Sequence, residues 1–302
     1  MDKSRYAGVF PAFYACYDDN GEVSAERTKA LATYLLKKGV KGLYVGGSSG
    51  ECIYQGVEER KKALEAVMEA VGGKLTVIAH VACNNTRDSQ ELARHAESLG
   101  VDAIAAIPPI YFHLPAYSIA DYWNDISAAA PNTDFFIYNI PVLAGVALTI
   151  PLLKEMLKNP RCVGVKNSSA ATQDIQMWQD CGGENFIVMN GPDEQFISGL
   201  AIGATGGIGG TYAVMPELFN RMFTLVGEGK LREARPIQYD ACNIIYKACS
   251  GRCNMYAMLK QVLKLQGIDI GSVRKPLTAL TPGDEAIARE VYDMIEAAKA
   301  KL

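Results

Sequence analysis

The sequence is poor in the residues that build metal centres. It holds only three histidines, at positions 80, 95 and 113, and no Cys-x-x-Cys pair. A structural zinc site needs cysteine and histidine ligands at close, regular spacings. We therefore expect neither a metal centre nor a bound cofactor. The net charge is only -3, and charges of both signs are mixed along the chain. Such a balance argues against a nucleic-acid partner.

Long apolar runs are also absent. No stretch approaches the roughly 18 residues that a membrane span needs, and the segment Met1–Tyr6 opens onto no signal-peptide core. The eight cysteines are irregularly spaced in a chain of 302 residues, which favours reduced, mostly buried thiols over disulfides. Cys249 and Cys253 form only a Cys-x-x-x-Cys pair, on an expected helix. We expect a cytoplasmic protein with no membrane partner.

Short apolar segments alternate with amphipathic ones from residue 7 to about residue 227. This alternation is typical of repeated βα units. The expected strands lie at 7–13, 42–45, 75–81, 103–107, 135–138, 162–166, 186–189 and 205–208. The expected helices begin near 24, 57, 86, 118 and 149, run through 175–178 and 193–202, and begin again near 215. Eight such pairs predict a (β/α)8 TIM barrel, with a doubly wound open sheet as the alternative.

The rest of the chain has the pattern of helices alone. They are expected at about 230–250, 253–266 and 284–301, with a linker rich in glycine and proline between the last two. We therefore expect a catalytic barrel over residues 1–227 and a three-helix C-terminal appendage over 228–302, with no second catalytic domain.

Lys166 ends one of the expected strands. The run Cys162–Val165 before it suits a strand buried on both faces. In barrels of this class, the carboxyl ends of the strands carry the chemistry. A desolvated lysine there loses proton affinity and becomes an amine that can form a Schiff base with a carbonyl. The alternative is that Lys166 marks the point where the strand reaches solvent.

The loop 46–51 follows the second expected strand and reads Gly-Gly-Ser-Ser-Gly-Glu. Its glycines let backbone N–H groups turn inward to form an anion-binding nest, and Ser48 and Ser49 add two hydroxyls. This arrangement suits a carboxylate. A phosphate loop is the alternative, but its Gly-x-x-x-x-Gly-Lys-Ser/Thr spacing is missing.

Tyr138 ends the fifth expected strand, just before Asn139, Ile140 and Pro141. Because the fifth and sixth strands of a barrel are neighbours, Tyr138 and Lys166 are expected at the same height. A phenol beside an amine can act as a general acid and base. The alternative is a core tyrosine whose hydroxyl is satisfied by the backbone.

Four motifs together carry a family resemblance. They are Gly-Gly-Ser-Ser-Gly-Glu at 46–51, Tyr-Asn-Ile-Pro at 138–141, Gly-Val-Lys at 164–166 and Gly-Pro-Asp-Glu at 191–194. In this order and spacing they resemble the dihydrodipicolinate synthase/N-acetylneuraminate lyase family. The resemblance covers the whole chain. It implies a barrel with C-terminal helices, a homotetramer, and metal-independent aldolase chemistry through a lysine–pyruvate Schiff base.

The resemblance also assigns roles to residues. Lys166 would form the Schiff base and Tyr138 would shuttle protons. Ser48 and Ser49, with the backbone at Gly47, would hold the carboxylate of the keto acid. Tyr111 would reach into the active site of a neighbouring subunit, unless it is a packing aromatic of its own loop.

The branch of the family is indicated by further residues. Synthases usually carry an arginine shortly after the Tyr-Asn-x-Pro motif, whereas this chain has only apolar residues and glycine at 142–145. The resemblance to sialic-acid lyases is closer. It places Gly191, Asp193 and Glu194 against the polyol tail of the sugar, although acids at a helix start also suit the helix dipole.

Three positions near these acids compare differently with the lyases. Ser168 stands where the lyases have threonine and keeps the hydroxyl. Gly210 replaces a substrate-contacting serine, and Pro192 replaces a bulkier residue. Both of the latter departures affect the expected polyol contacts.

The resemblance implies reversible cleavage of N-acetylneuraminate to N-acetylmannosamine and pyruvate. The enzymatic alternatives are cleavage of another 2-keto-3-deoxy sugar acid and a condensation like that of dihydrodipicolinate synthase. A non-catalytic alternative is a regulatory barrel that binds pyruvate or sialic acid.

Overall fold

The structure is a computed structural model that describes residues 3–302. Met1 and Asp2 begin the segment in which the sequence shows no signal peptide, and they lie outside the described residues. Within the described range, no helix is both long enough and apolar enough to cross a membrane.

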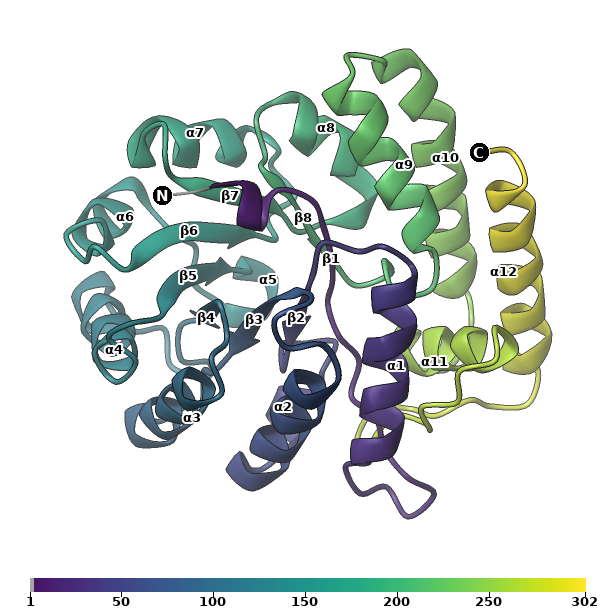
Figure 1. Cartoon of the computed structure of the whole chain (residues 1–302), viewed down its shortest axis with the longest axis horizontal. Coiled ribbons are helices and arrows are strands. Elements are labelled where there is room, and N and C mark those ends of the chain that lie inside the picture. The colour runs from purple at the N-terminus through teal and green to yellow at the C-terminus, as the bar shows by residue number, and fades with distance from the viewer. Residues whose placement is uncertain (1–2) are drawn as a thin grey trace.

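Eight parallel strands form a barrel at the centre of the molecule (Figure 1). Their bounds are β1 (Val9–Pro11), β2 (Gly42–Val45), β3 (Thr76–His80), β4 (Ala103–Ala106), β5 (Asp134–Asn139), β6 (Cys162–Asn167), β7 (Ile187–Asn190) and β8 (Gly206–Gly209). Each strand from β2 to β8 pairs with the next along the chain, and β8 pairs with β1. This sequential order confirms the TIM barrel and rules out the doubly wound sheet, whose strand order reverses at its centre.

Backbone contacts close the barrel between β1 and β2. The Lys41 N–H donates to the Val9 carbonyl at 3.0 Å, and the Phe13 N–H donates to the Tyr44 carbonyl at 2.9 Å. Because the ring is closed, the carboxyl ends of all eight strands face one rim.

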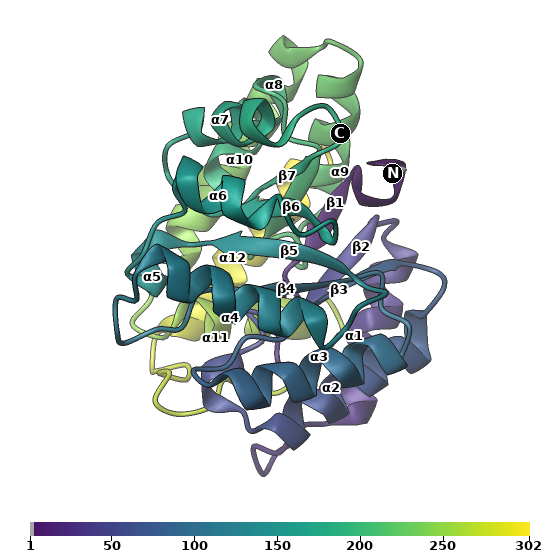
Figure 2. The ribbon, with the colours of Figure 1, turned by 90° about the vertical axis from the view of Figure 1, so that its left-hand side faces the viewer.

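Helices surround the strands, as Figure 2 shows from the side. The longer ones are α1 (Ala25–Lys37), α2 (Val57–Val71), α3 (Thr86–Ser98), α4 (Ala116–Ala128), α6 (Ile150–Met156), α7 (Gln173–Gly182), α8 (Phe196–Ala201) and α9 (Pro216–Gly227). Short turns are η1 (Lys3–Tyr6), η2 (Cys52–Tyr54), η3 (Asp193–Gln195) and α5 (Pro141–Ala144). α1 begins as its sequence indicates, because the Ser24 side chain accepts the Arg27 N–H.

Two local expectations are corrected. The expected helix over 193–202 is divided, because the 3-10 turn η3 precedes α8. The sequence did not indicate α5, a single turn that Pro141 starts and that Gly145 ends in the left-handed region at φ 71°.

The C-terminal helices α10 (Leu231–Ala248), α11 (Met255–Leu265) and α12 (Asp284–Lys299) gather on one side of the barrel (Figure 1). Cys249 caps α10, and Cys253 lies in the connection to α11, so the expectation of both on one helix was wrong. All eight cysteines are free thiols. Only Cys16 and Cys162 are buried and Cys249 is exposed, so the expectation of mostly buried cysteines was also wrong.

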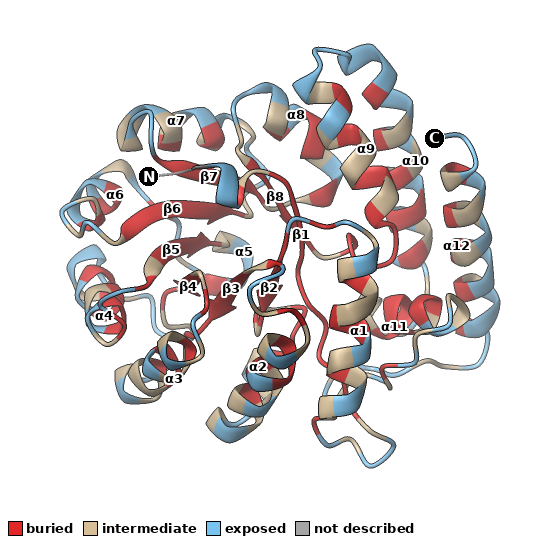
Figure 3. Cartoon of the chain, in the orientation of Figure 1, coloured by how far each residue is buried: buried red, intermediate tan, exposed pale blue. Residues whose placement is uncertain are grey.

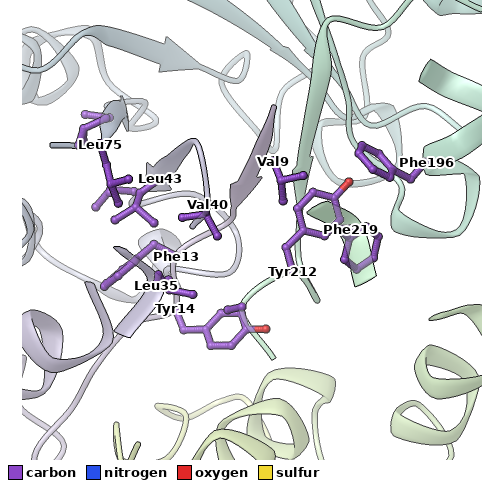
Figure 4. Packing of buried hydrophobic residues seen from close by; sticks show 14 of the residues in the cluster. Val9, Phe13, Tyr14, Leu35, Val40, Leu43, Leu75, Phe196, Tyr212 and Phe219 are labelled. Atoms are coloured by element: carbon purple, nitrogen blue, oxygen red, sulfur yellow. The ribbon is translucent and has the colours of Figure 1, made fainter. Parts of the chain in front are cut away.

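The buried side chains form two layers. The outer layer lies between strands and helices, where the outward helix faces are exposed (Figure 3). In it the rings of Tyr212 and Phe219 lie 3.9 Å apart (Figure 4). The inner layer fills the barrel, and Tyr6 packs edge-on against Phe136 in it, with ring centroids 5.0 Å apart. This filling leaves the rim, rather than a pore, as the place for a site.

Candidate active site

Lys166 and Tyr138 meet at the carboxyl ends of β6 and β5. The two residues are paired in the register of these strands, and they are only 4% and 3% exposed. The Lys166 Nζ lies 4.0 Å from the centroid of the Tyr138 ring and 4.1 Å from that of the Tyr44 ring. Within the described chain, Lys166 forms no ion pair with a carboxylate.

Burial lowers the pKa of Lys166 from 10.5 to about 7, and the negative charge of Asp193 opposes this lowering. A shift of that size represents about 5 kcal/mol. The two aromatic faces also attract the ammonium, by about 2 kcal/mol each at a desolvated site, and this partly offsets the effect of desolvation. A substantial fraction of Lys166 is therefore a neutral amine near neutral pH.

Tyr138 remains a protonated phenol at the same pH. Burial raises its pKa to about 12, while hydrogen bonds with Ser48 and Ser168 act in the opposite direction. The two serines come from the loops after β2 and β6. They connect the phenol to the rim, so protons can move along a chain of hydroxyls.

The loop 46–51 brings its serines to the same rim. The N–H of Gly50 donates to the Gly47 carbonyl at 3.0 Å, which tightens the turn. Ser49 is buried, and its hydroxyl donates to the Tyr256 hydroxyl of α11 at 3.0 Å. Gly47 lies behind the serines, where an added Cβ would come within 2.6 Å of the Tyr44 ring. A side chain at this position would therefore displace the loop.

Asp193 comes from η3, after β7. It is buried, and one of its carboxylate oxygens accepts the Thr211 N–H at 2.7 Å and the Thr211 hydroxyl at 2.5 Å. Burial raises its pKa to about 6, and the bonds from Thr211 oppose this. Its neighbour Glu194 is exposed. The pair therefore offers one buried acceptor, held by Thr211, and one exposed acceptor.

These side chains line one pocket of about 270 Å³ at the rim. The predicted residues among its walls are Ser48, Ser49, Tyr138, Lys166, Ser168, Gly191, Asp193, Glu194 and Gly210. Tyr111 and Gly47 do not line it. Tyr111 is 88% exposed, has a φ of 85°, and packs edge-on against Phe112. Its contact with a neighbouring subunit stays a prediction.

Several residues line the pocket that the sequence did not indicate as site residues. They are Ala12, Ile140, Leu143, Ile208, Thr211, Ile245, Met255 and Tyr256. Tyr256, Met255 and Ile245 come from the C-terminal helices, so these helices contribute directly to the site. No local motif marks them, because only the folded chain brings α10 and α11 to the rim.

Lys166 is the only basic side chain among the described residues that line this pocket. Within residues 3–302, no three histidine, cysteine, aspartate or glutamate side chains converge to hold a metal ion. The polar side-chain groups that line the pocket are thus an amine, two phenols, hydroxyls and carboxylates. This set suits imine formation and proton transfer.

A closed (β/α)8 barrel with a desolvated lysine at its rim has the architecture of an enzyme that works through an amine nucleophile. The sequence matches the dihydrodipicolinate synthetase family over residues 5–298. The chain belongs to this family.

Relatives confirm the branch that the sequence indicated. The chain is 64% identical to an N-acetylneuraminate lyase of Mediterraneibacter gnavus, over 98% of this chain and 95% of the relative. It superposes with a TM-score of 0.98 on a structure described as a Ruminococcus gnavus sialic acid aldolase catalytic lysine mutant, at 62% identity over 99% and 98% of the two chains. An N-acetylneuraminate lyase from Fusobacterium nucleatum gives a TM-score of 0.90 at 27% identity, over 96% and 99% of the chains.

Proposed function

We propose that this protein is a carbon–carbon lyase that reversibly cleaves N-acetylneuraminate to N-acetylmannosamine and pyruvate through an imine on Lys166. The observation that carries the proposal is the buried, unpaired Lys166 amine, aligned with Tyr138 in the pocket. The similarity to the Mediterraneibacter gnavus lyase over nearly the whole chain supports the choice of substrate.

Imine formation uses the lowered proton affinity of Lys166. The neutral amine attacks the ketone carbon of the open-chain 2-keto acid, and loss of water gives an imine that is then protonated. Ser48 and Ser49, with backbone N–H groups of their loop, hold the carboxylate. The Ser49 hydroxyl donates to the carboxylate and then accepts the Tyr256 hydroxyl instead of donating to it. The positively charged imine nitrogen serves as the electron sink, the role that a metal ion has in other aldolases.

Bond cleavage then depends on Tyr138. Because its pKa is about 12, this phenol cannot act as a free base near neutral pH. It instead accepts the proton of the C4 hydroxyl as it passes its own proton to the bound carboxylate. The C3–C4 electrons move to the imine nitrogen, giving an enamine and releasing the aldehyde. Protonation at C3 and hydrolysis then free pyruvate and Lys166.

The polar wall that Gly191, Asp193 and Glu194 add to the pocket suits the sugar tail. Asp193 and Glu194 accept hydrogen bonds from hydroxyls, and Gly191 adds a backbone carbonyl. Another 2-keto-3-deoxy sugar acid remains the enzymatic alternative, because Gly210 leaves part of this wall without a side chain. A synthase-like condensation is disfavoured, since no arginine stands in the described lining to bind a second carboxylate.

We infer that the enzyme assembles into a homotetramer and works in the cytoplasm without a cofactor. Exposed apolar side chains on the loops after the neighbouring strands β4 and β5 support the assembly, namely Tyr111, Phe112, Val142 and Leu143. A second copy that covers these side chains would bring its Tyr111 toward the pocket. Sedimentation of the purified protein tests the assembly directly.

Borohydride reduction in the presence of pyruvate tests the imine. We expect a reduced pyruvyl adduct on Lys166, located by intact mass and peptide mapping. A panel of 2-keto sugar acids, with pyruvate release as the readout, then identifies the substrate. A folded protein that gives no adduct would overturn the lyase mechanism. It would favour the non-catalytic barrel that binds pyruvate or sialic acid.

A further inference from the structure

A second buried lysine lies outside the catalytic pocket, close to the loop 46–51, which carries Ser48 and Ser49 and is called the serine loop below. Lys260 of α11 forms an ion pair with Glu51, the last residue of the loop 46–51, at 2.7 Å. The Lys260 and Glu51 side chains are 1% and 0% exposed. Lys260 also donates to the Ser272 carbonyl at 2.7 Å, and the second Glu51 oxygen accepts the Arg274 N–H at 2.9 Å. Every charged group of the pair therefore has its partners.

A buried ion pair adds little stability over an apolar pair of the same volume, because both charges must leave water. What it does provide is a fixed geometry, since the charges hold each other at a defined distance and angle. The role of the pair therefore lies in the backbone segments that it holds in place.

The pair restrains the backbone of the serine loop. Glu51 has a φ of 52°, in the left-handed region that a non-glycine residue adopts at a cost. The Glu51 N–H donates to the Ser48 carbonyl at 3.0 Å, which closes the turn, and the left-handed conformation of Glu51 then leads the chain into η2. Lys260 holds the Glu51 carboxylate and thereby restrains the residue that closes the turn. The turn brings Ser48 and Ser49 to the pocket.

The same helix holds the loop at a second point. Tyr256 lies four residues before Lys260, one turn away on the same face of α11. Its hydroxyl accepts the Ser49 hydroxyl at 3.0 Å. One rigid helix thus contacts the loop at both Ser49 and Glu51.

We propose that Lys260 is a positioning residue for keto-acid binding. Through its ion pair with Glu51, it fixes the hydroxyls and N–H groups of the serine loop at the height where the carboxylate of a Lys166-bound 2-keto acid lies. This role rests on the proposed lyase function. It concerns the affinity for the keto acid, because Lys260 does not touch Lys166 or Tyr138.

Pyruvate-dependent trapping with borohydride tests the role without an aldehyde partner. The main variant is Glu51→Gln with Lys260→Met, which removes both charges together and keeps their volumes. We expect the pyruvate concentration for half-maximal trapping to rise about tenfold, since loss of one hydrogen bond to a charged carboxylate weakens binding by that order. The trapping rate at saturation should stay within about twofold of that of the unchanged protein, because Lys166 is intact.

A single Glu51→Gln variant keeps the test decisive if the double variant fails to fold. Burial already lowers the pKa of Lys260, and Glu51 is the main group that opposes this. Without the carboxylate, Lys260 can lose its proton, so no unpaired charge stays buried. We expect the half-saturating pyruvate concentration to rise here as well.

The control is Glu217→Gln with Lys38→Met, which makes the same two substitutions in a partly exposed ion pair. It removes an ion pair of 2.6 Å that joins α9 to the end of α1, away from the pocket. We expect this control to leave the half-saturating pyruvate concentration unchanged. A fall in melting temperature for the Glu51 variants, with half-saturation unchanged, would overturn the positioning role. An unaltered protein that gives no adduct at any pyruvate concentration would instead overturn the proposed function, and the positioning role with it.

Discussion

Two buried lysines of this protein have different surroundings. Lys166 lies at the barrel rim, and Lys260 lies where α11 contacts the loop 46–51. Lys260 meets Glu51 at 2.7 Å, whereas Lys166 faces two aromatic rings and has no carboxylate of residues 3–302 within ion-pair distance. A buried cation with a carboxylate partner keeps its charge and holds two segments together. A buried cation without one loses its proton more easily and becomes reactive. The difference in partner, at nearly equal burial, separates the proposed nucleophile from the proposed positioning residue.

The largest effect should come from Lys166→Met, which keeps the volume but removes the amine. We expect lyase turnover to fall roughly 10⁴-fold or more, because the covalent intermediate cannot form. Borohydride trapping with pyruvate should disappear. The Lys260→Met variant is the comparison, and it should still form the adduct. Residual trapping in the Lys166 variant, on another lysine, would contradict the assignment.

For the free energy of unfolding, the larger effect should come from Lys260 rather than from Lys166. Lys260→Met leaves the Glu51 carboxylate buried and unpaired, which lowers the free energy of unfolding by about 3–5 kcal/mol. Lys166→Met removes a buried amine without a carboxylate partner, so its free energy of unfolding should not fall. Urea denaturation of both variants measures the contrast. Equal losses would mean that the two lysines have the same structural role.

Tyr138→Phe tests whether the reactive lysine needs its phenol. The ring that faces Lys166 stays in place, while the hydroxyl that moves protons is lost. We expect kcat for cleavage to fall by about 10² to 10⁴, the usual contribution of a general acid or base. Adduct formation with pyruvate at saturation should be affected less. A variant that cleaves at a normal rate would place the proton transfer on another group.

The sequence indicated the two groups of this reaction but not their partners. The bounds of β2 and α2 agree with expectation because apolar periodicity and glycine stops fix them locally. Lys166 and Tyr138 could be aligned because neighbouring strands of a barrel share their height. Tyr256 and the Lys260–Glu51 pair could not be found this way. Their contacts span more than 200 positions of the chain, and no local pattern specifies which helix returns to the rim.

The pH dependence of adduct formation tests whether Lys166 is a lysine with a lowered pKa. With the Lys166 pKa at about 7, the rate of adduct formation at fixed low pyruvate should rise about tenfold per unit below pH 7, and level off above it. The neutral amine is the reactive form, so the rate increases with pH. Trapping by cyanoborohydride over pH 5–9 measures this profile. A rate that still rises steeply at pH 9 would mean that Lys166 keeps an ordinary proton affinity.

The free energy of unfolding should also depend on the protonation of Lys166. The Lys166 pKa is lowered from 10.5 in the free side chain to about 7 in the fold, so the unfolded chain binds more protons between these values. The free energy of unfolding should therefore rise with pH from about 7 to 10.5, relative to the Lys166→Met variant. Urea titrations of both proteins at three pH values measure the difference. Parallel stability profiles would contradict the lowered pKa.

The smallest effect concerns the polar wall of the pocket that is proposed to bind the sugar tail, where Gly210 lies. A Cβ at Gly210 would meet the Tyr256 hydroxyl at 3.6 Å and the Ser49 hydroxyl at 3.8 Å, which are ordinary contacts. Gly210 also lacks a left-handed φ, so Gly210→Ser should change the free energy of unfolding by less than about 0.5 kcal/mol. The added hydroxyl faces the pocket, where one hydrogen bond contributes about 1 kcal/mol.

We therefore expect the KM for N-acetylneuraminate to fall about fivefold in Gly210→Ser, with half-saturation by pyruvate unchanged. Gly210→Ala is the matched control, because it adds the same carbon without the hydroxyl, and its KM should stay near that of the unchanged enzyme. A rise in KM for both variants would mean that the substrate occupies the space beside the glycine. In that case the sugar tail lies against the backbone at Gly210, and the natural substrate is a sugar acid whose tail fills that space.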